Sequence, residues 1–144
     1  MQNMSTVTTS ANEATAQFLP TPERKSQLKL STEIEVHEDV TVVHCHGRIA
    51  YRDEAASLSR TVAQLLPRAQ QIVLDLRDIE MIDSAGLGSL ITALHLANAS
   101  GSSLRLASPN RQTLSLFQLT NLDTVFEIYP ALQDALLVSH WQMA

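Results

Sequence analysis

Residues 72–98 limit the possible fold more than any other part of the chain, because the apolar periodicity changes within them. The stretch begins with a short apolar run, IVLDL at residues 72–76, which one acidic residue interrupts. A short run rich in β-branched residues predicts a strand that is covered on both faces. Further on, apolar residues recur at the spacing of one face of an amphipathic helix, at Leu87, Leu90, Ile91, Leu94 and Ala97. The stretch therefore predicts a buried strand, a tight polar turn and a helix.

The turn, DSAGLG at residues 83–88, carries the candidate site. The start of a helix has unpaired backbone N–H groups and a partial positive charge, so it suits an anion. Asp83 or Ser84 can cap this helix, because a short side-chain oxygen reaches those N–H groups. Ser84 can instead hold a phosphoryl group there. Gly86 and Gly88 have no Cβ, which allows another chain to approach closely.

Composition and charge argue against several classes of protein. The chain has 144 residues, a length typical of one domain, and an apolar content of 44% is sufficient for a core. A net charge of −5 without a basic run argues against binding to nucleic acid or to an anionic membrane surface. No apolar run is long enough for membrane insertion, and the single cysteine, Cys45, fits a reducing compartment. We therefore expect a cytoplasmic protein.

The order of the predicted elements gives the fold class. Residues 1–27 are predicted to form a flexible tail, and residues 28–144 the folded domain. The expected strands cover residues 28–36, 40–49, 72–76, 103–107 and 125–129, and helices are expected after the last four of them. Ile34 and Val36 alternate with Glu33 and Glu35, which predicts a half-exposed first strand with its apolar residues on the covered face. Pro67 should end the first helix early, Gly101 should end the second, and Asn121 the third. From the last helix, Leu132, Leu136, Leu137 and Trp141 should face the core. This alternation predicts an α/β fold: a mixed, mostly parallel sheet with an antiparallel N-terminal edge hairpin and about four helices.

The segment LDLRDIEMIDSAGLGSL, residues 74–90, resembles the signature of the STAS domain of bacterial anti-sigma factor antagonists. That signature reads LDL, a short spacer, and then a hydrophobic residue followed by Asp-Ser-Ser/Ala-Gly-Leu-Gly. The sequence Gly47-Arg48-Ile49 is also similar to the end of the second STAS strand. The resemblance covers about residues 28–141 and implies a STAS-like fold.

The resemblance also implies a function. An antagonist of this family binds an anti-sigma factor that is an ATP-dependent serine kinase, and phosphorylation of one serine ends the binding until a serine phosphatase reverses it. Ser84 matches that serine, whereas the common second serine of the family is Ala85 here. The partner-binding residues implied are Asp83, Ser84, Ala85, Gly86, Leu87 and Gly88. A binding protein of this kind needs no cofactor or metal and is not an enzyme.

Two other functions and a metal site are weighed against this hypothesis. The chain can instead be a STAS subunit of a stress-signalling scaffold or of a transport complex. A small serine hydrolase using Ser84 is less favoured, because Ile82 replaces the first glycine of the Gly-x-Ser-x-Gly motif. His44 and His46 lie on one face of a predicted strand with Cys45 on the other, so this triplet does not form a closed metal site.

Overall fold

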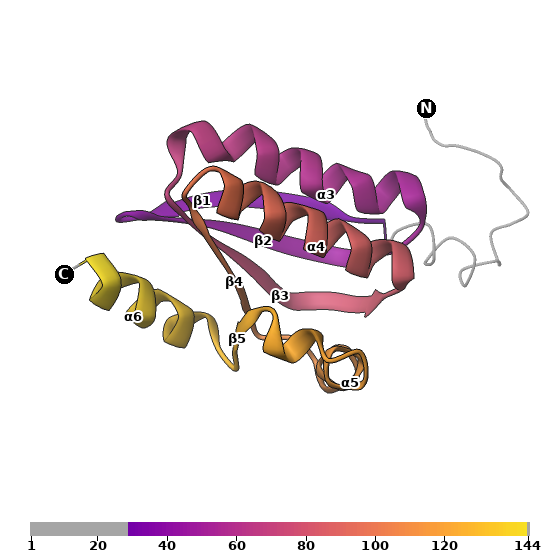
Figure 1. Cartoon of the computed structure of the whole chain (residues 1–144). Helices are drawn as coiled ribbons and strands as arrows, with labels where there is room; N and C mark the ends of the chain where they lie inside the picture. Colours follow the sequence, from indigo (N-terminus) through magenta and orange to yellow (C-terminus); the bar gives the residue numbers. More distant parts are fainter. Residues whose placement is uncertain (1–28, 144) are drawn as a thin grey trace, which may run out of the picture.

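The computed structural model describes residues 29–143, and within them the chain forms one sheet with helices on both faces (Figure 1). The strands lie in the order β1-β2-β3-β4-β5; β1 pairs with β2 antiparallel, and the other pairs are parallel. This arrangement confirms the predicted fold class. The strands are β1 (Ser31–His37), β2 (Val40–Ile49), β3 (Gln71–Ile82), β4 (Ser103–Ala107) and β5 (Glu127–Tyr129). The helices are α3 (Arg52–Leu65), α4 (Ser84–Ala99), α5 (Arg111–Leu119) and α6 (Leu132–Met143).

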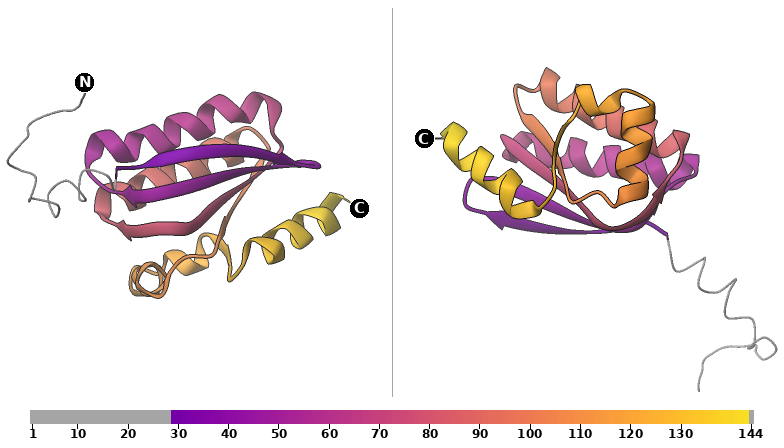
Figure 2. Two further views of the ribbon diagram at one scale, coloured as in Figure 1. Left: turned by 180° about the vertical axis from the view of Figure 1, so that it is seen from behind. Right: turned by 90° about the horizontal axis from the view of Figure 1, so that it is seen from below.

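Two apolar clusters hold the helices to the sheet. Helices α3 and α4 lie side by side over one face, whereas α6 lies across the other (Figures 1 and 2). The larger cluster fills the α3–α4 side and extends to α5, where the rings of Phe117 and Phe126 have centroids 5.9 Å apart. The smaller cluster lies under α6 and contains Val40, Val42, Val73, Ala107 and Ala135. Each large aliphatic side chain buried in this way stabilises the fold by roughly 1.5–3 kcal/mol.

Strand β3 is much longer than the predicted strand at residues 72–76. It continues to Ile82 because β2 runs beside it for its whole length, with Ile49 opposite Ile82. Within β3, strand β4 pairs with residues 71–75 alone, so β2 is the one neighbour of the polar second half of β3 in the described part of the chain. The extra length carries the chain to the start of α4, next to the end of β2.

The buried faces of β1 and α4 also differ from the predicted ones. Ile34 and Val36 were expected on a covered face, but they are 46% and 72% exposed because β1 is an edge strand. In α4 the buried residues are Gly86, Ser89, Leu90, Ala93 and Ala97, whereas the predicted Leu87, Ile91 and Leu94 are only partly buried. Most of the buried residues of α4 are small, because the helix packs closely against both α3 and the sheet.

Local sequence rules correctly predicted several ends of elements. Helix α3 ends at Leu65, and Pro67 lies in the short 3-10 helix η2 (Leu66–Arg68) that follows. Gly101, with φ 73°, ends α4, and the N–H of Ser102 donates to the carbonyl of Ala97 at 2.8 Å. Asn121, with φ 59°, precedes the 3-10 helix η3 (Leu122–Thr124).

The expectations about the chain ends have different outcomes. The last strand is shorter than predicted and begins at Glu127, and Leu137 is 57% exposed rather than in the core. The predicted tail and the side chain of Trp141 lie outside the described residues.

Among residues 29–143, no helix combines the length and the apolar character that crossing a membrane requires.

Candidate functional site

Asp83 caps helix α4 and joins it to the start of α3. Its Oδ1 accepts a hydrogen bond from the N–H of Gly86 at 2.8 Å, and its Oδ2 accepts one from the N–H of Tyr51 at 2.9 Å. Of the two candidate caps, the structure therefore selects Asp83. Desolvation raises the pKa of the Asp83 carboxyl, but backbone N–H donors, first those of Tyr51 and Gly86, outweigh it and lower the pKa below its usual value.

Ser84 is the first residue of α4, and its side chain is exposed. Its hydroxyl makes no hydrogen bond to any residue in the described range, whereas nearby serines donate to helix carbonyls. Ser57 donates to Glu54 at 2.6 Å, Ser59 donates to Ala56 at 3.1 Å, and the buried Ser89 donates to Ala55. Ser84 therefore differs from these three serines in presenting a free hydroxyl at a helix start.

A shallow groove of about 460 Å³ between α3 and α4 includes Ser84. Arg52, the first residue of α3, lines the same groove. The remaining lining residues are small: Ala55, Ala56, Ser59, Ala85, Ser89 and Thr92. An arginine and a helix start on one groove make its surroundings suitable for negative charge.

The two glycines of the turn have different surroundings. Gly86 is buried, and a Cβ placed on it would lie 1.9 Å from the carbonyl oxygen of Ile49 and 2.8 Å from Cγ2 of Ile82. The close approach at Gly86 is thus made within this chain, which corrects the expectation that another chain approaches there. Gly88 is exposed, and no atom of the described residues lies within 4 Å of a Cβ placed on it. Ala85 and Leu87 pack partly against the main cluster.

Sequence reasoning missed Tyr51, which lies beside the site. Its backbone has φ 61° and ψ 144°, and a non-glycine residue in such a region costs about 1–3 kcal/mol. The N–H of Tyr51 donates a hydrogen bond to Asp83, and the guanidinium of Arg48 lies 4.5 Å from the centre of the Tyr51 ring. A sequence signal was present, because Tyr51 lacks the short oxygen-bearing side chain that normally caps a helix such as α3.

An apolar hollow next to the start of α4 was also missed. It has a volume of about 350 Å³ and lies between the end of β3 and α5, where Met81, Leu116 and Leu119 line it. Met81 is 44% and Leu119 is 82% exposed. Met81 precedes Asp83 by two residues, so this apolar surface lies next to the candidate site.

The metal hypothesis gains no support from the structure. Among residues 29–143, no group of three His, Cys, Asp or Glu side chains is placed to hold a metal ion. Cys45 points into the main cluster, and burial, with the charge of Asp75, raises the pKa of its thiol to about 12. Its thiol is therefore a neutral member of the core.

The model of the STAS domain family matches residues 31–135, so the chain belongs to this family. A segment of 66 residues is 38% identical to a Thermotoga maritima protein assigned as an anti-sigma factor antagonist. That segment is 46% of this chain and 58% of the relative, so the chain spans less than two thirds of the relative's length.

Solved structures show the same fold. An anti-sigma factor antagonist from Mycobacterium paratuberculosis is 26% identical, with a TM-score of 0.68 over 77% of this chain and 94% of that protein. The unphosphorylated antagonist SpoIIAA has a TM-score of 0.62 at 15% identity, over 74% of this chain and 93% of that one, and shares the fold alone. SpoIIAA from Bacillus has also been solved in a phosphorylated form.

Replacing Asp83 tests the cap. We expect Asp83→Ala to lower the free energy of unfolding by about 1–2 kcal/mol at neutral pH, measured by urea denaturation. The folded state lowers the pKa of Asp83, so its ionised carboxylate stabilises the fold above the pKa of the unfolded state, about 3.9. This stabilisation is lost as pH falls through the pKa of the folded state. Asp83→Asn should not show this loss of stability at acid pH, because an amide side chain does not ionise. Asp53→Asn, in the first turn of α3, is the matched control, and equal effects at both positions would contradict the assignment.

Proposed function

We propose that this protein is an anti-sigma factor antagonist that binds an anti-sigma factor of the serine-kinase type. In this proposal, phosphorylation of Ser84 by that partner ends the binding, and a serine phosphatase restores it. The observation that carries the proposal is the free, exposed hydroxyl of Ser84 on the first residue of α4, directly after the capping Asp83. The names of the sequence and structural relatives support the general role.

The surroundings of Ser84 favour a phosphate that leaves the fold intact. A phosphoserine carries about 1.5–2 negative charges at neutral pH, and a helix start stabilises such charge. Arg52 on the same groove adds a cation. The added charge would therefore act on the partner, through repulsion and desolvation, rather than on the stability of α4.

The surface around Ser84 is suited to a protein partner. Gly88 lies one turn further along α4 and leaves the helix surface flat, and the hollow with Met81 and Leu119 exposes apolar side chains nearby. Exposed apolar surface beside polar groups is typical of a protein interface. We infer that the contact surface includes Asp83, Ser84, Ala85, Leu87 and Gly88, whereas Gly86 supports it from inside the fold.

A regulatory role fits these observations better than catalysis. A serine nucleophile needs a base within hydrogen-bond reach, and the hydroxyl of Ser84 has no such contact among the described residues. The role of a STAS subunit in a scaffold or transport complex remains the second candidate, because it uses the same fold.

Affinity capture from the source cells with two forms of the protein tests the proposal. We expect wild-type protein to capture an ATP-dependent serine kinase, and Ser84→Asp to capture much less of it, because the carboxylate places charge in the interface. Capture of a transport ATPase equally by both forms would instead favour the second candidate. Labelling of Ser84 by a serine-hydrolase probe would contradict the proposal.

A further inference from the structure

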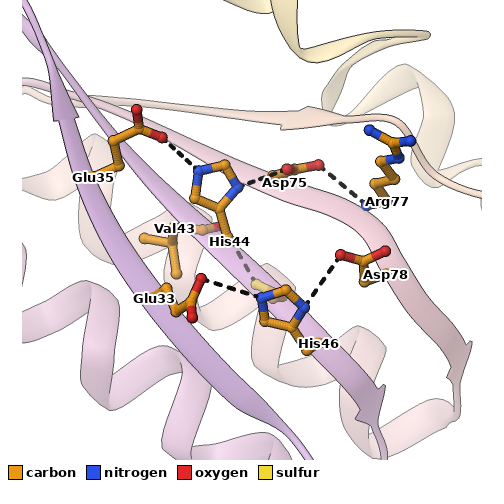
Figure 3. A network of polar contacts seen from close by, with 9 residues as sticks. Glu33, Glu35, Val43, His44, His46, Asp75, Arg77 and Asp78 are labelled. Carbon is orange, nitrogen blue, oxygen red and sulfur yellow. Dashed lines mark hydrogen bonds and ion pairs between the residues drawn. The ribbon is translucent and has the colours of Figure 1, made fainter.

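The open part of the sheet beyond the start of α6 carries a row of histidines and carboxylates (Figure 3). His44 and His46 belong to β2 and point to the same side as the residues under α6. Carboxylates flank each histidine from both neighbouring strands: Glu33 and Glu35 from β1, and Asp75 and Asp78 from β3. The row therefore links three strands by side chains on one face.

His44 has a carboxylate oxygen at each ring nitrogen. Its Nδ1 lies 2.8 Å from Oδ2 of Asp75, and its Nε2 lies 2.7 Å from Oε1 of Glu35. A neutral imidazole has one N–H and can donate to only one of two ionised carboxylates, whereas an imidazolium donates to both. The contact with both carboxylates at once therefore favours the charged form of His44.

His46 has a looser version of the same arrangement. Its Nδ1 lies 3.2 Å from Asp78 and its Nε2 lies 3.6 Å from Glu33, beyond a good hydrogen bond. The side chain of His46 is 37% exposed, compared with 23% for His44. His46 is thus a natural comparison for His44 within the same row.

Apart from its backbone ladder with β2, strand β1 has few contacts that hold it in place. Within residues 29–143 it is an edge strand that pairs with β2 alone, and its apolar Ile34 and Val36 remain largely exposed. We propose that His44 acts as a pH-dependent clamp, which holds β1 to β2 and β3 while its imidazolium bridges Glu35 and Asp75. Loss of the charge would loosen β1 and expose the hydrogen-bonding edge of β2.

The direction of the pH dependence follows from the groups around His44. The hydrogen bond to Glu35 raises the pKa of His44 most, burial opposes it, and Asp75 raises it further, so the net pKa lies above the usual value. Arg77 and Asp78 of β3 are the other charged residues that line the adjoining hollow, and they carry opposite charges. The residues that line it before and at the start of α6 (Pro130, Ala131, Leu132 and Gln133) are uncharged. The clamp is therefore fully formed below the unfolded pKa, about 6.5, and is lost as pH rises through the folded value.

The first test is an NMR titration of the His44 ring. Glu35→Gln should lower the pKa of His44 by about one unit, a tenfold change in the protonation equilibrium, because it removes the charge at Nε2. Glu33→Gln, which alters the partner of His46 on the same strand, is the matched control and should leave His44 nearly unchanged. If the pKa of His44 were identical in wild type and in Glu35→Gln, the proposal would be overturned.

The second test is hydrogen exchange of the β1 amides, compared with those of the central strand β3, at pH 6 and at pH 8.5. In wild-type protein the protection of β1, corrected for the intrinsic rate, should fall by about tenfold at the higher pH, whereas that of β3 should change little. In His44→Gln the protection of the β1 amides should be low at both pH values. Protection of β1 in wild type that does not depend on pH would show that His44 is not a clamp.

Discussion

Gly86→Val is expected to lower the free energy of unfolding by about 3 kcal/mol or more, a large fraction of the roughly 5–15 kcal/mol that stabilises a domain. The added side chain would meet the carbonyl of Ile49, 1.9 Å from the Cβ position, and the side chain of Ile82. A backbone carbonyl in a strand end cannot rotate away as a flexible side chain can. The substitution therefore has to displace β2 or the first turn of α4.

The same substitution two residues further along is the matched control. Gly88→Val adds its side chain where no atom of residues 29–143 lies within 4 Å of the Cβ position. Valine is also a slightly better helix residue than glycine, so stability should be unchanged or a few tenths of a kcal/mol higher. Urea denaturation of both variants measures the difference. Similar stabilities for the two would contradict the packing described for Gly86. Gly88→Val should instead weaken partner binding, because it alters the exposed surface beside Ser84.

Local rules of sequence predicted the parts of the structure that depend on neighbouring residues. The change of periodicity after residue 83 located α4, and Pro67, Gly101 and Asn121 marked the ends of elements through their own backbone preferences. The position of Ser84 at the start of α4 followed from the same local argument, together with the resemblance of residues 74–90 to the STAS signature. Its free hydroxyl did not follow, because either Asp83 or Ser84 could have capped the helix.

Features that depend on distant residues were not predictable in this way. The length of β3 is determined by its pairing with β2, and the burial of Gly86 depends on Ile49. Asp83 and Ser84 were both possible caps, and the structure shows that Asp83 caps α4 through the N–H of Gly86. The N–H of Tyr51, which is distant in the sequence, donates to its second oxygen. The carboxylates of Glu35 and Asp75 reach His44 only because the sheet brings β1 and β3 to either side of β2.

Phosphorylation of Ser84 is expected to weaken binding to the anti-sigma factor by roughly a hundredfold, about 3 kcal/mol, because it places a desolvated charge beside Asp83 in the interface. Ser84→Ala should retain wild-type stability, because Asp83 rather than Ser84 caps α4. It should also retain binding and resist phosphorylation. Ser84→Asp should fold equally well but weaken binding less than phosphate does, because it carries only one charge.

Incubation of the full chain with ATP and the cognate kinase, followed by mass spectrometry and by binding measurements on the modified protein, tests the central claim most directly. We predict a single phosphate on Ser84, with binding lost in the phosphorylated protein and kept in Ser84→Ala. A phosphate on Ser57, Ser59 or Ser89 with Ser84 unmodified would contradict the site. Equally tight binding by wild type, Ser84→Ala and the fully phosphorylated protein would contradict the switch.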